Sequence, residues 1–92
     1  MINSLIIDEK DSVVVAIEGI SKGREVNYKL GEEVKTVVAK DDIQIYHKVA
    51  IKNVKKGEPV VKYGQHIGLA AADIEVGQHV HVHNVESHRE DL

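Results

Sequence analysis

The stretch of this chain best suited to chemistry is Gly77–Asn84, GQHVHVHN, where three of the six histidines stand at every second residue. Alternate side chains of an extended strand share a face, so His79, His81 and His83 are expected on one side, with the intervening valines in the core. Two histidines at i and i+2 can chelate one divalent ion, whereas three on a straight strand would span about 13 Å. The pattern predicts either a metal pair, His79 and His81, or a solvated strand face made of histidine.

A second candidate is the pair His47-Lys48, which follows Asp41-Asp42 and precedes an apolar run. A histidine beside a lysine could bind an anionic substrate or transfer protons near neutral pH, although such pairs are also common on surfaces. Lys48 and Lys62 could together hold a substrate carboxylate. The adjacent carboxylates point to opposite sides of an extended chain, so they are expected to terminate strands.

The composition favours a mainly β domain that carries these residues. The chain has 15 Val and 10 Ile against 4 Leu, with no Phe or Trp. Branched side chains at Cβ pack well on half-buried pleated strands and lose rotamer freedom in helices. Ninety-two residues favour one domain with one modest core. We expect a single domain over 1–92, with an ordered core of about 1–85 and a flexible tail over 86–92.

Short apolar runs separated by turn residues predict the strands. A hairpin is expected to turn at Gly64-Gln65, with glycine first in the turn, and a helical turn is conceivable only at Ala70–Ala72 or around 42–50. We read Val85–Ser87 as chain leaving the domain. The expected strands are Leu5–Asp8, Val13–Glu18, Glu25–Leu30, Val34–Val38, Val49–Lys52, Val60–Tyr63, Ile67–Ala70 and His79–His83.

Three segments share one pattern, in which Ile or Val is followed three residues later by glycine and after three more by valine. The copies are VAIEGISKGREV (15–26), VAIKNVKKGEPV (49–60) and, more loosely, AAADIEVGQHV (70–80). The pattern predicts a strand, a turn that needs glycine, and a new strand whose first inward residue is valine. It indicates a compact pseudo-symmetric β fold, or else only recurrent turn chemistry.

Several functional classes are disfavoured. The net charge is −3, with acidic and basic residues interspersed, so the concentrated positive field expected of a nucleic-acid-binding protein is missing. The chain has no cysteine, which excludes disulfides and thiolate ligands. We found neither a signal-peptide pattern nor an apolar segment long enough to cross a bilayer, so we expect a cytoplasmic protein without a membrane partner.

Residues 50–87 resemble the small N-terminal domain of the altronate and galactarate dehydratase family. The matching motifs are Lys62-Tyr63-Gly64, Ile67–Ala70, Asp73-Ile74 and His79–Asn84, and weaker similarity extends over the rest of the chain. One departure concerns the backbone before His47, where the family usually has Pro-x-Gly and this chain has Gln44-Ile45-Tyr46.

The resemblance implies an SAF domain with a β-clip fold, acting as a small accessory subunit of a metal-dependent hydroxy-acid lyase. It implies a large catalytic subunit, a hydroxy-acid substrate, and a divalent metal, iron, held tightly only in the complete enzyme. Under it, His79 and His81 are expected as metal ligands, His83 and His47 as catalytic groups, and Lys48 and Asn84 as substrate-binding groups. The alternative is a non-catalytic SAF module that binds carbohydrate or protein. An isolated domain with exposed strand edges could also self-associate.

Overall fold

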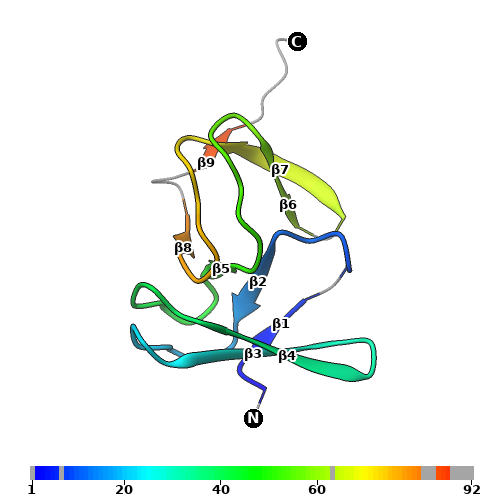
Figure 1. The fold of residues 1–92 in the computed structure, drawn as a ribbon, viewed down its shortest axis with the longest axis vertical. Coiled ribbons are helices and arrows are strands. Elements are labelled where there is room, and N and C mark those ends of the chain that lie inside the picture. Colours follow the sequence, from blue (N-terminus) through cyan, green and yellow to red (C-terminus); the bar gives the residue numbers. More distant parts are fainter. Residues whose placement is uncertain (1, 7, 63, 82–84, 88–92) are drawn as a thin grey trace.

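Nine short strands form three small antiparallel sheets in the computed structural model, which describes residues 2–6, 8–62, 64–81 and 85–87 (Figure 1). The central sheet has the order β1-β2-β5-β8, flanked by the hairpin β3-β4 and by the sheet β6-β7-β9. The strands are β1 (Ser4–Leu5), β2 (Val13–Ala16), β3 (Glu25–Leu30), β4 (Glu33–Val38), β5 (Lys48–Ala50), β6 (Pro59–Lys62), β7 (Gln65–Ala70), β8 (His79–Val80) and β9 (Val85–Ser87).

The expected β class is confirmed, since the described residues contain strands and turns but no helix. The helical turns considered at Ala70–Ala72 and around 42–50 are accordingly wrong: Ala70 ends β7, and Lys48–Ala50 form β5. No helix in the described ranges could cross a membrane.

Two strand predictions need correction. Val85–Ser87 do not leave the domain but form β9, paired with β7 from Gly68↔Ser87 to Ala70↔Val85. β9 thus extends through Ser87, two residues past the expected end of the core, whereas 88–92 lie outside the described residues. In the β6-β7 hairpin Lys62 pairs with Gln65, so Gln65 belongs to β7 and not to the turn, and Gly64 directly precedes that strand.

The repeated pattern occurs four times in the structure, once more than the sequence suggested. Each copy has a buried alanine, a buried Ile or Val four residues later, a turn residue with positive φ three residues on, and a buried valine after three more. The copies are Ala16-Ile20-Gly23-Val26, Ala39-Ile43-Tyr46-Val49, Ala50-Val54-Gly57-Val60 and Ala70-Ile74-Gly77-Val80.

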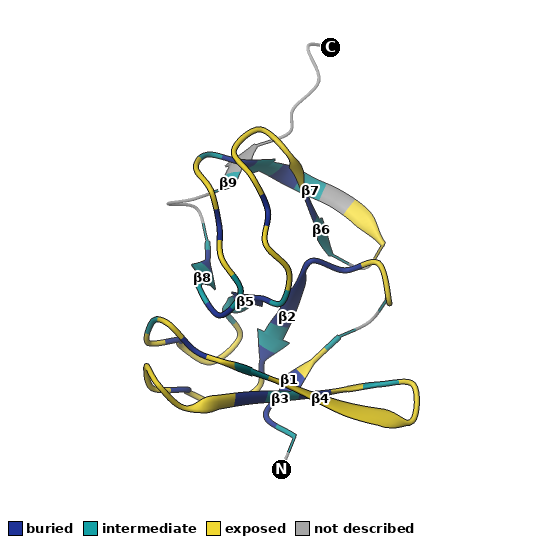
Figure 2. Cartoon of the chain, viewed as in Figure 1, coloured by how far each residue is buried: buried dark blue, intermediate teal, exposed yellow. Residues whose placement is uncertain are grey.

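The copies pair two by two, and each pair builds one core cluster. The first two copies form one lobe, joined by a bridge between Ile20 and Ile43, and the last two copies form the second lobe, joined by a bridge between Val54 and Ile74. The buried residues of the first two copies pack with Val14 and Tyr28, and those of the last two pack with Val13. The two clusters lie on opposite faces of the central sheet, because neighbouring residues of a strand point to opposite sides. Figure 2 shows this burial along β2, with β4 mostly exposed.

Each turn is anchored to the copy it pairs with. The amides of Gly23 and Gly57 donate to Ala39 and Ala70, at 2.8 Å in both cases. In return, the amide of Tyr46 donates to the carbonyl of Ala16 (2.7 Å) and the amide of Gly77 to the carbonyl of Ala50 (2.8 Å). The pseudo-symmetric fold expected from the repeated motif is therefore present, with the second copy hidden in the sequence because Tyr46 stands where the others have glycine.

Candidate functional site

His47, His79 and His81 form a cluster at the edge of the central sheet. His47 immediately precedes β5, His79 begins β8, and His81 follows it in a bend. The antiparallel register pairs Lys48 with Val80 and Val49 with His79, so one further step along the ladder brings His47 opposite His81. The cluster thus results from the pairing of β5 with β8, two strands that are distant in the chain.

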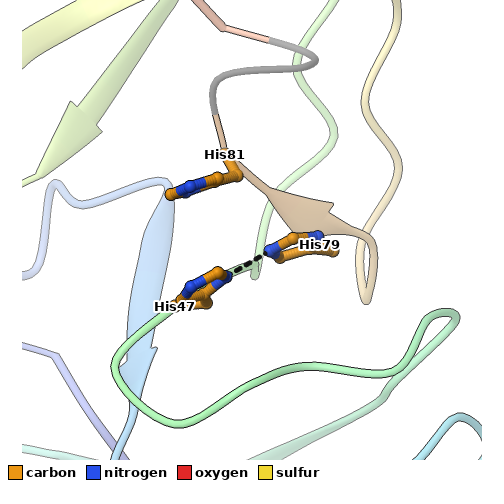
Figure 3. A group of neighbouring side chains, drawn as sticks. All are labelled: His47, His79 and His81. Carbon is orange, nitrogen blue, oxygen red and sulfur yellow. Dashed lines mark hydrogen bonds between the residues drawn. The ribbon is translucent and has the colours of Figure 1, made fainter.

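The three rings lie close together with nearly parallel planes, His81 above His47 and His79 beside His47, as Figure 3 shows. The centroids of His47 and His81 are 4.3 Å apart, and those of His47 and His79 are 5.0 Å apart, with planes inclined by 15° and 13°. The Nδ1 of His47 and the Nε2 of His79 are 2.9 Å apart, a hydrogen bond in which one nitrogen carries the proton and the other accepts it. All three side chains are half-buried, which leaves one side of the cluster accessible.

The geometry allows the cluster to hold a metal ion. One nitrogen from each ring lies within 4.8 Å of the others. Ligand nitrogens around a tetrahedral ion are about 3.4 Å apart, so a ring movement on the order of 1 Å would bring all three to one ion. Catalytic metal sites commonly use three protein ligands and keep a further position open for water or substrate.

Part of the predicted strand face is confirmed. Val80 is 1% exposed and points into the core, while His79 and His81 remain half-buried on the other side. β8 ends at Val80 and not at His83, and residues 82–84 lie outside the described residues. The predicted roles of His83 and Asn84 therefore fall on residues about which the structure says nothing.

The sequence did not reveal His47 as the third member of the cluster. The metal pair expected from the sequence was His79 and His81, and any further ligand had to come from elsewhere in the fold or from another chain. The pairing of β5 with β8 brings His47 to this pair. The signal that could have shown it is the spacing Ala39-Ile43-Val49, which marks a fourth copy of the repeat and places a strand directly after His47.

Asp41 and Asp42 have structural roles, as expected of strand-terminating carboxylates. The Oδ2 of Asp41 accepts the backbone N–H of His79 at 2.9 Å, on the outer edge of β8. The Oδ1 of Asp42 accepts the N–H of Lys22 at 2.8 Å. Asp41 thus fixes the strand that carries two of the histidines, and its carboxylate is engaged with backbone.

Lys48 lies on the other face of β5. It pairs with Val15 and Val80, whose face is opposite to that of Val49 and His79 because side chains alternate along a strand. Burial lowers the pKa of Lys48, and the nearby positive charge of Lys62 lowers it further. The structure therefore brings the two lysines near each other but does not bring Lys48 to the histidines.

Comparison with known proteins identifies the family. The family model described as the altronate/galactarate dehydratase SAF domain matches residues 2–88. The chain belongs to this family. The resemblance seen in the sequence motifs is confirmed, and the all-strand fold is that of a small mainly β SAF domain.

Relatives of this SAF domain are lyases of two kinds. It is 39% identical to an altronate dehydratase of Bacillus subtilis over 94% of its length, and 40% identical to an altronate dehydratase of Escherichia coli over 89%. It is 37% identical over 96% of its length to a protein of Chromohalobacter salexigens named (2R)-sulfolactate sulfo-lyase subunit alpha. The chain spans 16% of the length of each altronate dehydratase but 97% of the subunit alpha.

Proposed function

We propose that this SAF domain is the accessory part of a hydroxy-acid lyase and contributes His47, His79 and His81 to an active site completed by a larger chain. The observation that carries the proposal is the three-histidine cluster, built at an accessible sheet edge in a family whose relatives are named as lyases. A cytoplasmic location is part of the proposal.

The substrate class that we favour is a sugar acid of the altronate or galactarate type, with elimination of water. Elimination of sulfite from sulfolactate is the second possibility within the same class, and it is supported by the 97% coverage of the subunit alpha. Both reactions remove a group next to a carbon that loses a proton, so both need a base and a group that assists departure.

The histidine cluster is proposed to hold a divalent metal, iron, in the complete enzyme. When bound, such an ion supplies Lewis-acid polarisation of a hydroxyl or carboxylate oxygen. Neutral imidazoles offer the lone pairs that such an ion needs. The proton in the hydrogen bond between His47 and His79 must leave the ring nitrogens that bind the ion. Asp41 fixes the backbone of His79 and so helps to position its ring.

The proton at the substrate carbon must be removed by a group outside the cluster, because three metal-bound imidazoles have no free lone pair for it. His83 and the larger chain are the candidates, and Asn84 is proposed to bind substrate beside His83. Lys48, on the opposite face of β5, remains a weaker proposal for a substrate carboxylate.

The test of the function is reconstitution with the chain from the same genome that matches the remaining length of the altronate dehydratases. We expect the mixture to dehydrate altronate or galactarate, measured as 2-keto acid, or to release sulfite from sulfolactate. His47→Ala, His79→Ala and His81→Ala should each lower the rate by at least ~100-fold, as loss of a metal ligand or of a positioned catalytic group does.

His66→Ala in β7 is the matched control and should retain activity, because it changes a histidine of a different sheet. Equal activity of the wild type and all three cluster variants would refute the assignment. A wild-type mixture without activity on any of these acids would instead favour the non-catalytic binding module.

The metal proposal has a separate readout in the isolated chain. Three ligands on one chain should give weak binding of Co²⁺, seen as a rise in melting temperature that saturates with metal concentration. His47→Ala should abolish the rise as fully as His79→Ala does. A rise that persists without His47 would show that the cluster is not the site.

A further inference from the structure

Tyr46 is the one non-glycine residue with positive φ in the described part of the chain, at 69°. It stands third in a turn closed by the bond from the His47 amide to the Gln44 carbonyl, a position that requires positive φ in a type II turn. The equivalent positions of the other copies are glycines with φ between 88° and 94°: Gly23, Gly57 and Gly77. A bulky side chain is disfavoured there because its Cβ crowds the following carbonyl oxygen.

The same turn lacks a second stabilising feature that its counterparts have. In the other three turns, the amide before the glycine donates to an Asp or Asn side chain: Lys22 to Asp42, Lys56 to Asp73 and Val76 to Asn53, at 2.8–3.0 Å. The residue that would cap Ile45 in this way is Gly19, which has no side chain. The turn that carries His47 is thus locally the least favourable of the four.

What this turn presents to solvent is an apolar surface. Tyr46 is 71% exposed, and Ile45 and Ile17 are 47% and 38% exposed. The backbone bonds from the Tyr46 N–H to the Ala16 carbonyl and from the Ala16 N–H to the His47 carbonyl place Tyr46 beside Ala16, the residue that precedes Ile17. We call Ile17, Ile45 and Tyr46 the Tyr46 patch; it adjoins His47, whose ring stacks on His79 and His81.

We infer that the Tyr46 patch is a contact surface for the larger lyase chain, an inference that rests on the proposed function. Strained backbone persists where the rest of the structure enforces it, and it concentrates at functional sites. Two isoleucines beside a tyrosine do not suit a polar hydroxy acid, but aromatic and aliphatic side chains together are typical of protein interfaces.

The relatives indicate what kind of partner would cover the Tyr46 patch. This domain is 16% of the altronate dehydratases and nearly the whole of a protein named subunit alpha, so in the relatives it belongs with further polypeptide. A contact at the Tyr46 patch would bury the tyrosine and exclude water beside His47 at the same time. Tyr46 then serves association in this chain, although glycine, which the family usually has at this position, suits the turn better.

Tyr46→Gly tests the inference, because it should make the isolated chain more stable and at the same time weaken its binding to the larger chain. We expect the melting temperature of the isolated chain to rise by about 2–5 °C as the turn relaxes. We expect the dissociation constant for the larger chain, measured by titration calorimetry with the reconstitution partner defined above, to increase about 30-fold, typical of a central tyrosine. Val38→Ala, which truncates a 55% exposed side chain on β4, is the matched control and should bind like the wild type.

An unchanged or tighter dissociation constant in Tyr46→Gly overturns the inference. So does a variant whose only defect is loss of self-association in sedimentation, since the patch would then receive a second copy of this chain. The proposed function is tested independently by the cluster variants, which should bind the larger chain normally yet lack activity. If they lose activity while Tyr46→Gly binds normally, only the role of the patch is refuted.

Discussion

Gly19→Asn should stabilise the turn that carries His47 by giving it the cap that the other three turns have. The equivalent residue of the second lobe is Asn53, whose Oδ1 accepts the N–H of Val76 at 3.0 Å. An asparagine at position 19 would face the amide of Ile45 in the same way. The site has room, because a Cβ at Gly19 would meet nothing nearer than the carbonyl oxygen of Ile43 at 4.0 Å, and its φ is not positive.

Two terms make up the expected gain. Replacing glycine by a residue with fewer unfolded conformations contributes about 0.4–1 kcal/mol. One further hydrogen bond contributes about 0.5–1.5 kcal/mol, at the lower end here because the turn is exposed. The free energy of unfolding should therefore rise by about 1–2 kcal/mol, which for a chain of this size corresponds to roughly 5–10 °C in melting temperature.

Urea denaturation of three variants separates the two terms. Gly19→Ala should give the entropic part alone, Gly19→Asn should exceed it by the hydrogen bond, and Asn53→Gly should destabilise by about the same total in the opposite direction. If Gly19→Asn is no more stable than Gly19→Ala, no cap forms, and the equivalence of the four turns on which the reasoning depends is wrong.

Two further predictions concern a glycine turn and a buried lysine. Gly57→Ala should lower the free energy of unfolding by about 1 kcal/mol, because only the positive φ opposes an alanine there. Gly77→Ala should lower it by roughly 3 kcal/mol or more, because the added Cβ would also overlap the carbonyl oxygen of Val38. Equal urea midpoints for the two variants would contradict this. Lys48 has a lowered pKa in the folded chain, so the unfolded chain keeps this proton to higher pH and stability should increase as the pH rises toward 10.5. Lys48→Met should reduce that increase between pH 7 and 10, and an identical pH dependence in both proteins would argue against burial of the charge.

The features that depend on local chemistry could be predicted from the sequence. Valine and isoleucine outnumber leucine, so strands were expected, and all eight expected strands overlap strands of the structure. The turns at Gly23, Gly57 and Gly77 were predicted correctly, because a backbone position with positive φ favours glycine. The alternation in His79-Val80-His81 separated core from surface, because the period of a strand is two.

Other features arise only when distant segments meet. β9 was missed because Val85–Ser87 is too short to show a pattern until it pairs with β7. The turn at Tyr46 was not recognised as a repeat because its third residue is not glycine, and the bond from Tyr46 to Ala16 in β2 becomes visible only in the tertiary structure.

The sequence by itself therefore determined the class of fold, the family and the histidine pair on one strand. The tertiary structure alone decided that His47 completes the cluster, because the register between β5 and β8 sets which side chains become neighbours across the sheet. That register follows from burying Val49 and Val80 in opposite cores, a constraint that acts on the whole domain and on no single stretch of it.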